Sequence, residues 1–544
     1  MTEGQKKSLI AGGLTSTAGI FLVKMLGVLY VSPFTALATS QNLSYYARAY
    51  SFYDIVVRLS VSGLPFAIAT LVARYALKEE FKTVLYIRKL AFALMAVIGF
   101  VAMVSMILLA TPLALFSVQS GLQSTEVIYT RNVIMIIALA IFVVPLLSSY
   151  RGYLQGLKEF RVYATSQVLE QIARVSFLLG LGFILVVLLN MDAIWAVYAA
   201  IMATSVSALC SLAYLIYKDR KTNGNIRELA LNQTQAVPRR KELLLELMYF
   251  ALPFMLNAIL SNTDQLINLM LFNRAMIMSG STVKEANLYY SLILLTTNKL
   301  TSIPQVIAPG FAIAIIPFVT ESFEKKDIAK LREHVLSAFN TVLYIALPLT
   351  LFLFAISDKV YYVMYGGDVL VQGAKVLTIN SILGVEVAMV MVIDAMMLAL
   401  RLRKLNLGLT AIAFAVRLII FIPLVVLMGY AGSIVSGILT QSIYILVCLY
   451  VLKRQYQVNY HSLYKTLIQS AIGLSAMALC FMALDFIGLR VTDQGRWMGL
   501  LELSIYGILG VAVYMGITEY MHVPKRLFHV SFTQLIKKAF HAFG

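Results

Sequence analysis

Charged side chains occur inside apolar runs of this sequence that are long enough to cross a bilayer. A charge at the bilayer centre costs about 2.5–3.5 kcal/mol on insertion scales, so such a residue usually faces a partner or a cavity. The chemistry open to these residues is therefore ion pairing or ligand binding. The basic members are Lys24, Arg58, Arg174, Lys299 and Arg417, and the acidic members are Asp54, Glu170, Asp264, Glu386 and Asp394.

Three of these cations could bind one anion together. Lys24 and Lys299 have no carboxylate four residues away on their helices, whereas Arg58 has Asp54 at that spacing. If the three helices meet, they form a basic pocket inside the membrane that suits a phosphate or pyrophosphate group. The alternative is that each long side chain reaches the membrane surface, which is difficult for Lys24 because it lies deep in its run. The pattern favours the pocket.

The remaining charges also allow structural explanations. Glu170 and Arg174 are four residues apart and can neutralise each other on one helix face. In the second half of the chain one cation accompanies three carboxylates, and this set could be a fixed internal salt bridge or an ion-coupling site. Its members are Asp264, Glu386, Asp394 and Arg417. Both explanations stay open at this point.

The elements that must position these residues are membrane-spanning helices. The chain has 544 residues, of which 60% are hydrophobic and 13% are charged, whereas soluble domains contain about 25% charged residues. This composition excludes a soluble enzyme, a disordered chain and a coiled coil. A spanning helix needs about 20 mostly apolar residues. We expect fourteen spans, at 9–37, 50–74, 88–112, 132–150, 164–189, 193–217, 247–272, 288–320, 337–357, 372–400, 405–428, 431–451, 464–485 and 498–520.

The basic residues predict the orientation of these spans. Lys and Arg number 44 against 26 Asp and Glu, and they concentrate in every second loop. Cytoplasmic loops are rich in Lys and Arg, so we expect both termini in the cytoplasm, and no nucleic acid is needed to explain the net charge. Cys210, Cys448 and Cys480 show no spacing typical of a disulfide framework or a zinc site. The first apolar run is interpreted as a retained helix and not as a signal peptide.

A repeated segment divides the chain into two halves. The letters FAIA follow a glycine in the second span, from Phe66, and again in the eighth span, from Phe311. Spans that lie six apart have the same orientation, so the halves would be related by an axis along the membrane normal. We expect an all-α integral membrane protein with two six-helix lobes around a central cavity and two extra C-terminal helices. The predicted parts are an N-lobe at 1–217, a cytoplasmic linker at 218–246, a C-lobe at 247–451, and helices 13 and 14 with a cytoplasmic tail at 452–544.

Motifs of soluble catalysis are absent from the sequence. It contains no HExxH, GxSxG or Walker loop, which mark zinc hydrolases, serine hydrolases and nucleotide-binding proteins. We therefore expect a transporter without catalytic residues or a cofactor. A membrane-embedded glycosyl-lipid ligase or polymerase would be expected to carry a catalytic acid in a large outer loop, and the outer loops here are short. A pure scaffold would leave the basic residues inside the spans unexplained.

Four segments resemble a known family. They are VKMLG at 23–27, DIVVRLSVSGLPFAIATLVARY at 54–75, SSYRGYLQGLKEFRVYATSQVLEQIARV at 148–175 and NKLTSIPQVIAPGFAIAIIPFV at 298–319. The sequence resembles the multidrug/oligosaccharidyl-lipid/polysaccharide (MOP) exporter superfamily, and within it the branch of MurJ and stage V sporulation protein B (the YtgP-like proteins). The RGYLQG block at 151–156 is the most specific segment. The resemblance covers helices 1 to 12 in order, and two extra C-terminal helices are typical of MurJ.

The resemblance implies roles for individual residues. The residues that match the basic lining of the family's substrate cavity are Lys24, Arg58 and Lys299. The family often has a second arginine on helix 1, where this sequence has Tyr30. Arg48, at the outer end of helix 2, is a candidate to compensate, and Asp54 is a supporting candidate beside Arg58.

The resemblance also implies an ion site, although the match is incomplete. The family's suggested sodium site uses a carboxylate on helix 7, which could be Asp264. Its helix 11 partners are not matched, and Arg417 stands in that helix, where it could supply the charge of a cation. Glu386 and Asp394 remain candidates for coupling or for an internal salt bridge. Coupling to the membrane potential or to a cation is the expected energy source.

The function implied by the resemblance is that of a flippase in the bacterial cytoplasmic membrane. Its substrate would be a polyprenyl-pyrophosphate-linked saccharide, with the peptidoglycan precursor lipid II as the first candidate, moved by alternating access. The alternatives are a flippase for another lipid-linked polysaccharide unit of capsule or teichoic type, or a MATE-like drug/cation antiporter, against which the basic residues argue. The implied partners are the anionic lipid-linked substrate, the bilayer and the cell-wall synthesis machinery, without nucleic acid.

Overall fold

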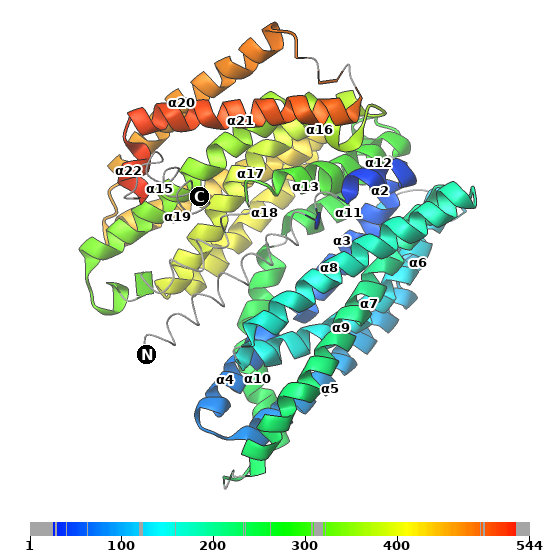
Figure 1. Ribbon diagram of the computed structural model, residues 1–544, viewed down its shortest axis with the longest axis vertical. Helices are drawn as coiled ribbons and strands as arrows, with labels where there is room; N and C mark the ends of the chain where they lie inside the picture. Colours follow the sequence, from blue (N-terminus) through cyan, green and yellow to red (C-terminus); the bar gives the residue numbers. More distant parts are fainter. Residues whose placement is uncertain are drawn as a thin grey trace, which may run out of the picture. The chain divides into compact units, whose positions relative to one another are not determined.

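The computed structural model is all-helical, without strands, over the residues that it describes (Figure 1). These residues are 26–27, 30–39, 41–61, 64–118, 123–157, 159–231, 233, 235–261, 263–305, 308, 319–320, 322–489, 491–492 and 495–528. Side chains are described at these positions except at 58–61, 66, 160, 221–225, 250 and 252–264. The chain forms two compact units, Met1–Ser291 and Leu292–Gly544.

Ten helices in the described ranges are long and apolar enough to cross a membrane. They are Phe81–Leu108, Thr125–Gly156, Arg161–Leu188, Ile194–Arg220, Ile328–Ala355, Leu370–Ala399, Arg403–Met428, Tyr430–Tyr456, His461–Phe486 and Arg496–Tyr520. They confirm the predicted spans 3 to 6 and 9 to 14. The other four predicted spans each include residues outside the described ranges, so the total of fourteen and the two-lobe layout stay predictions.

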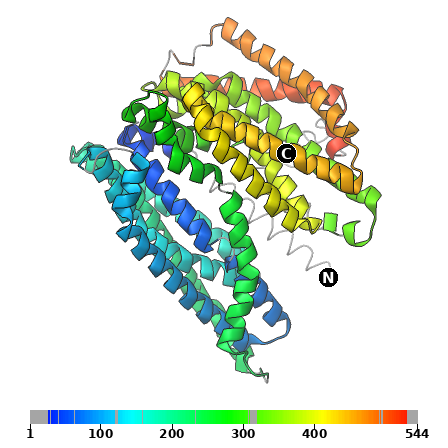
Figure 2. The same ribbon diagram turned by 180° about the vertical axis from the view of Figure 1, so that it is seen from behind.

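The first unit is built around a long helix, α7. Its helices are α2 (Val31–Ala38), α3 (Leu43–Val61), α4 (Leu64–Leu77), α5 (Phe81–Leu108), α6 (Ala110–Val118), α7 (Thr125–Gly156), α8 (Phe160–Phe183, continued by the π-helical turn η1 at Ile184–Leu188), α9 (Ile194–Leu231), α10 (Arg240–Ser261), α11 (Thr263–Met278) and α12 (Val283–Ser291). α7 packs against α3, α4, α5 and α9, and α5, α7 and α9 lie side by side (Figure 1, Figure 2). These contacts make α7 the most deeply buried span of the unit.

Two glycines of the RGYLQG block let α7 approach α4 closely. A Cβ at Gly152 would lie 2.7 Å from the backbone oxygen of Pro65, and a Cβ at Gly156 would lie 2.7 Å from that of Ala69. No side chain fits in so short a gap, so glycine is required at both places. The most specific segment of the sequence therefore has a packing role as well as a charged residue, Arg151.

The polar stretch predicted as a linker is partly helical and is bonded to the first unit. α9 continues to Leu231, and α10 begins at Arg240. The buried Asp219 forms an ion pair with Arg88 of α5. Gln233 accepts hydrogen bonds from the backbone N of Lys82 at 2.6 Å, and so caps the start of α5. The boundary between the compact units falls later, after Ser291, and the predicted division into lobes stays a prediction.

The second unit has α17 at its centre. Its helices are η2 (Leu292–Thr296, a π-helical turn), α13 (Thr297–Thr301), α15 (Ile328–Ala355), α16 (Ser357–Tyr365), α17 (Leu370–Ala399), α18 (Arg403–Met428), α19 (Tyr430–Tyr456), α20 (His461–Phe486), α21 (Arg496–Tyr520) and α22 (Val523–Phe528). α17 packs against α13, α15, α16 and α19. Asp327 caps α15 by accepting a hydrogen bond from the Lys330 N at 3.1 Å, which holds the pKa of that carboxyl below its usual value.

The two last spans, α20 and α21, pack against each other and against α15. Small residues allow the contact, because a Cβ at Gly473 would meet the Tyr514 ring at 2.9 Å and one at Gly510 would meet the Phe481 ring at 2.6 Å. The predicted extra pair of C-terminal helices is therefore present as two spans of the second unit.

Candidate functional site

The structure describes one side chain of the predicted basic pocket. Lys24 lies outside the described residues. Arg58 lies on α3, but its side chain is outside the described part, and Asp54, one turn earlier, is half-buried. Lys299 is described, on α13 of the second unit. The pocket as a set of three cations therefore stays a prediction.

Lys299 stands on a short helix that is fixed on its opposite face. Thr297 and Thr301 are buried there, and Asn380 of α17 donates a hydrogen bond to the Thr297 Oγ1 at 2.9 Å. Tyr365 of α16 donates to the backbone oxygen of Thr296 at 2.9 Å. The Lys299 side chain is half-buried, and no carboxylate among the described residues lies within ion-pair distance of it. A hydrogen-bonded base thus presents an ammonium group that has no counter-ion among the described residues.

The π-helical turn η2 sets the direction of this side chain. A π turn shifts all following residues around the helix axis, and such turns are frequent at functional sites. Here the Thr297 hydroxyl donates to the backbone oxygen of Leu292, five residues earlier, at 2.8 Å. This bond stabilises the turn and places the two threonines against α17, so that Lys299 points elsewhere. The sequence offered no signal for this turn.

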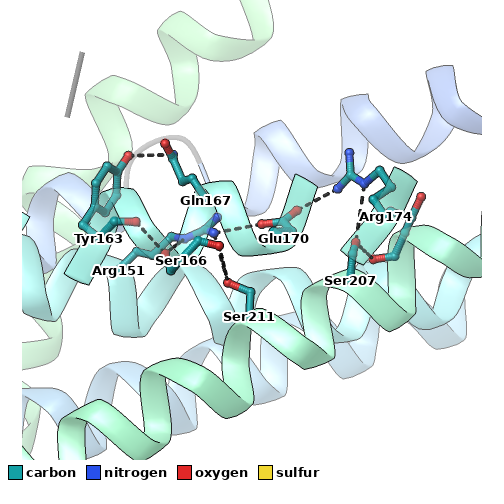
Figure 3. A network of polar contacts seen from close by, with 9 residues as sticks. Arg151, Tyr163, Ser166, Gln167, Glu170, Arg174, Ser207 and Ser211 are labelled. Carbon is teal, nitrogen blue, oxygen red and sulfur yellow. Dashed lines mark hydrogen bonds and ion pairs between the residues drawn. The ribbon is translucent and has the colours of Figure 1, made fainter. Parts of the chain in front are cut away.

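A second charged group lies inside the first unit (Figure 3). Glu170 of α8 accepts hydrogen bonds from Arg174 at 2.7 Å and from Arg151 of α7 at 2.9 Å. Ser211 of α9 accepts from the Arg151 guanidinium at 3.2 Å, and Ser207 accepts from the Arg174 Nε at 3.4 Å. The predicted Glu170–Arg174 pair is confirmed. Arg151 was assigned to a loop by its place in the sequence, yet α7 extends past it and buries most of its side chain.

The three charged side chains of this group have a net charge of +1. Two guanidinium groups face one carboxylate, and all three side chains are about 15% exposed. An excess cation in a low-dielectric interior raises the local positive potential, which favours an anionic ligand nearby. The hydrogen bonds themselves hold α7, α8 and α9 together.

Arg48 of α3 is fully buried and is held by neutral acceptors. Its guanidinium donates to the Asn273 Oδ1 of α11 at 3.1 Å, to the Asn287 Oδ1 of α12, and to the backbone oxygen of Ser117. The group also lies over the Tyr290 ring, 4.5 Å from its centroid. In this conformation the protein itself binds both terminal nitrogens of the Arg48 guanidinium, and the predicted supporting role of Arg48 at the substrate stays a prediction.

The end of α6 explains how a buried cation is tolerated without a carboxylate. Ser117 and Val118 are the last residues of α6, and Asn273 donates to the backbone oxygen of Val118 at 3.2 Å. The unpaired carbonyls at a helix C-terminus carry partial negative charge, which stabilises a nearby cation. Arg48 and Asn273 thus cap α6 and connect it to α3, α11 and α12.

An apolar cavity lies one helical turn from Arg48. It has a volume of about 340 Å³ and is lined by side chains of α3, α5, α6 and α11, among them Phe52, Met106, Phe116 and Leu269. A concave apolar site of this size can enclose part of a hydrocarbon chain. Arg274 lies beside it, with its guanidinium 4.5 Å from the centroid of the Phe116 ring.

The predicted charges of the second half occupy separate surroundings. The Glu386 carboxyl accepts a hydrogen bond from Ser442 at 2.5 Å. The Asp394 carboxyl is in hydrogen-bond contact with Asn406 of α18 and Tyr444 of α19. Arg417 is buried, and its Nη2 lies 3.5 Å from the backbone oxygen of Ser433. The Asp264 side chain lies outside the described part.

A metal site is not evident in the part of the chain that the structure describes. No group of three or more His, Cys, Asp or Glu side chains there could hold a metal ion. Sodium binding at Asp264 and the choice between coupling site and salt bridge therefore stay predictions. Sequence reasoning gave no grounds to select Asn273, Asn287, Asn406 and Tyr444. The signal available for the three asparagines was only that amide side chains occur within or beside apolar runs.

Sequence comparison connects these features to known proteins. A sequence model of the family described as "Polysaccharide biosynthesis protein" matches residues 9–323, which is more than half of the chain. "Lipid II flippase MurJ" of Bacillus subtilis (strain 168) is 26% identical over 516 residues, covering 93% of this chain and 94% of the relative. "Stage V sporulation protein B" of the same organism is 23% identical over 369 residues, covering 67% and 68%.

Solved structures agree in fold. A lipid II flippase MurJ in an inward closed conformation matches with a TM-score of 0.66 at 12% identity, covering 94% of this chain and 99% of that chain. An inward-facing multidrug resistance MATE family transporter of the MOP superfamily matches with a TM-score of 0.63 at 14% identity, covering 81% and 94%. At these identities the likeness shows the fold alone, which is that of the MOP transporters. The expected resemblance is confirmed, and the chain belongs to the polysaccharide biosynthesis protein family.

Proposed function

We propose that this protein is a flippase for a polyprenyl-pyrophosphate-linked saccharide, with lipid II as the first substrate to test. Three observations support the proposal: the ten apolar helices, the family, and a similarity to lipid II flippase MurJ that covers most of both chains. Flipping makes and breaks no covalent bond. The protein therefore has to bind a charged head group inside the membrane and to release it on the other side.

The single observation that carries the proposal is the environment of Lys299. Its ammonium group is half-buried within a membrane-spanning unit and has no carboxylate partner among the described residues. Such a charge is costly in the membrane unless it faces a cavity or a ligand. A diphosphate supplies the missing negative charge, and a lysine binds it as a point charge without a required geometry. The predicted partners Lys24 and Arg58 would complete the site.

The buried charges of the first unit include a net positive charge, which selects for anionic substrates. Arg151 and Arg174 together exceed Glu170 by one positive charge. This excess favours an anionic head group and disfavours the cationic substrates of a drug antiporter. The lipid tail has no need to enter a polar cavity, because apolar surface such as that between α3, α5, α6 and α11 can accept a hydrocarbon chain.

Alternating access requires contacts that open and close, and the Arg48 group is suited to this. With both termini in the cytoplasm, as the loop charges favour, Arg48 lies near the outer surface. It bonds α3, from the first predicted half, to α11 and α12, from the second. Breaking these bonds would separate the two sets of helices at the outer side, where the product leaves.

A translocation assay on purified protein tests the proposal. Lys299→Ala should weaken head-group binding by about tenfold to a hundredfold, because a hydrogen bond to a charged group contributes about 1.5–3 kcal/mol. Lys299→Arg should retain activity, since it retains the charge. The matched control is Lys375→Ala, an exposed lysine on α17. Lipid II movement in proteoliposomes at wild-type rate by Lys299→Ala would contradict the proposed site.

A second candidate is the flipping of another lipid-linked polysaccharide unit. The similarity to stage V sporulation protein B supports this second candidate, because family membership alone does not determine which saccharide is moved. A diphosphate site such as that at Lys299 binds the diphosphate that these lipids share and does not contact the sugar that distinguishes them. Complementation of a strain depleted of its lipid II flippase distinguishes the two, because only a protein that accepts lipid II restores growth.

A further inference from the structure

A carboxyl, a phenol and an amide meet where α17, α18 and α19 pack together. The Oδ1 atom of Asp394 lies 2.6 Å from the Tyr444 hydroxyl oxygen and 3.2 Å from the Asn406 Nδ2. The same Tyr444 oxygen is also in hydrogen-bond contact with the Asn406 Oδ1. Asn406 and Tyr444 are each 7% exposed, and Asp394 is half-buried. Three polar groups thus form a closed triangle inside an apolar bundle.

The number of hydrogen atoms in this triangle is decisive. A phenol has one hydrogen and can donate one hydrogen bond. Here its oxygen contacts two acceptor oxygens, one of Asp394 and one of Asn406. If Asp394 is ionised, one of these two oxygen–oxygen contacts has no hydrogen atom between its oxygens. With a protonated Asp394, the carboxyl donates to the Tyr444 oxygen, Tyr444 donates to the Asn406 Oδ1, and the Asn406 Nδ2 donates back to Asp394.

Reversing the amide of Asn406 does not remove the need for this proton. The oxygen and nitrogen of an asparagine amide are assigned from their hydrogen bonds. In the reversed orientation the Asn406 Nδ2 donates to the Tyr444 oxygen, and Tyr444 donates to Asp394. The Asn406 Oδ1 then faces the Asp394 Oδ1, and two acceptors again need a hydrogen between them. A protonated carboxyl therefore supplies the missing hydrogen in both orientations.

A bound metal ion does not account for the geometry. Ligand oxygens lie about 2.0–2.6 Å from a bound Mg²⁺ or Ca²⁺, so oxygens of separate ligands are about 3 Å or more from each other. The Asp394–Tyr444 distance of 2.6 Å is shorter and is typical of a strong O–H···O hydrogen bond.

Among the described side chains around Asp394, none supplies a charge that would keep it ionised. α19 presents Tyr444 and, one turn along, Cys448. α18 presents the neutral Asn406, and the cations nearest to it along that helix are Arg403 and Lys404 in the first turn. The face of α15 that packs in this core is apolar. Among the described residues no ion pair involves Asp394. A buried carboxyl without a cation favours its neutral form.

We propose that Asp394, with Tyr444 and Asn406, is a proton-binding site, that it is protonated in this conformation, and that release of its proton drives a change in the packing of α17, α18 and α19. Release of the proton leaves one hydrogen between three facing oxygens, so at least one contact must break. The bonds across the triangle connect three helices of the second unit, and their loss loosens this contact. Proton binding thereby becomes linked to the conformational equilibrium. The role of this proton as the coupling ion of transport rests on the proposed flippase function. Protonation of Asp394 can be measured without any substrate.

Infrared difference spectroscopy of the purified protein tests the site directly. A protonated carboxyl has a C=O stretching band that disappears on ionisation. We expect such a band in the wild type at neutral pH, its loss in alkaline solution, and the loss of its Asp394 component in Asp394→Asn. The control Asp368→Asn changes an exposed carboxyl between α16 and α17 and should leave the band unchanged. Glu386→Gln should also leave the Asp394 component in place, which separates the two half-buried carboxyls of α17.

Several results would overturn the inference. A wild-type protein without a protonated-carboxyl band at neutral pH refutes it, and this result does not depend on whether Asp394→Asn folds. A band that is unchanged in Asp394→Asn assigns the proton to another residue. Tyr444→Phe removes the acceptor of the proton, so an unchanged titration of the band in this variant refutes the triangle.

The link to transport is tested in proteoliposomes with an imposed pH gradient. We expect wild-type lipid II movement to respond to the gradient and Asp394→Asn, whose amide mimics the neutral carboxyl, to lose the response. Equal responses refute coupling through Asp394. A wild-type protein that shows the titrating band but moves no lipid II refutes the proposed substrate and supports the proton site, so the two failures are distinguishable.

Discussion

Replacing Arg48 by methionine tests whether one buried cation holds four helices together. Methionine keeps an unbranched side chain but removes every donor. Three acceptors then lose a hydrogen bond, namely the Asn273 amide, the Asn287 amide and the backbone oxygen of Ser117. The contact of the guanidinium with the Tyr290 ring is lost as well. The wild-type contacts connect α3, α6, α11 and α12.

The magnitude follows from the number of bonds and from the cost of burial. A hydrogen bond from a charged donor contributes about 1.5–3 kcal/mol, but desolvation of the buried guanidinium offsets much of the total. Breaking a buried charged network by removing one partner costs about 3–5 kcal/mol. We therefore expect Arg48→Met to shift the equilibrium away from this conformation by roughly a hundredfold to several thousandfold.

Cysteine labelling measures this shift at a residue that the network protects. Ser51 is 3% exposed and its Oγ accepts a hydrogen bond from the Tyr290 hydroxyl at 3.3 Å. In a background with the native cysteines replaced by alanine, Ser51→Cys should react slowly with a water-soluble maleimide. Adding Arg48→Met should accelerate the reaction and lower the melting temperature in detergent.

The matched control is Arg274→Met, which removes an exposed arginine of α11. Substitutions on the surface usually change stability by less than about 0.5 kcal/mol, so labelling and melting should resemble the wild type. The reasoning fails if Arg48→Met and Arg274→Met give the same labelling rate and melting temperature. Arg48→Lys should lie between them, because one ammonium retains the charge but cannot reach both amides in the geometry of a guanidinium.

Two further changes test the packing of the first unit. Glu170→Gln leaves two buried arginines without a counter-ion, and we expect a loss of about 3–5 kcal/mol in stability, measured by thermal unfolding in detergent; unchanged unfolding would show that the charges are solvated. Gly152→Ala places a Cβ 2.7 Å from the backbone oxygen of Pro65 and should lower the melting temperature and yield. The control Gly180→Ala, which has no atom within 4 Å of its Cβ, should match or exceed the wild type in both. Equal effects of the two substitutions would refute the close contact.

The sequence by itself determined which segments cross the membrane and where two charges pair. Apolar length is a property of a single segment, so the ten described spans agree with prediction. The Glu170–Arg174 pair was also predictable, because residues four apart on a helix are neighbours wherever the helix lies. The family resemblance was carried by short segments such as RGYLQG, both of whose glycines meet α4 in the structure.

Only the tertiary structure decided which distant groups these charges meet. The amides that hold Arg48 are 225 and 239 residues away in the sequence, and Arg151 reaches Glu170 only because α7 and α8 pack against each other. The partners of Asp394 come from two other helices. Hydropathy and helical spacing describe one helix at a time, whereas the partner of a buried polar group is set by which helices pack together and at what register. A charged residue in a span can therefore be recognised from the sequence, but whether it binds a ligand, a proton or a neighbouring helix depends on contacts between helices that no local pattern records.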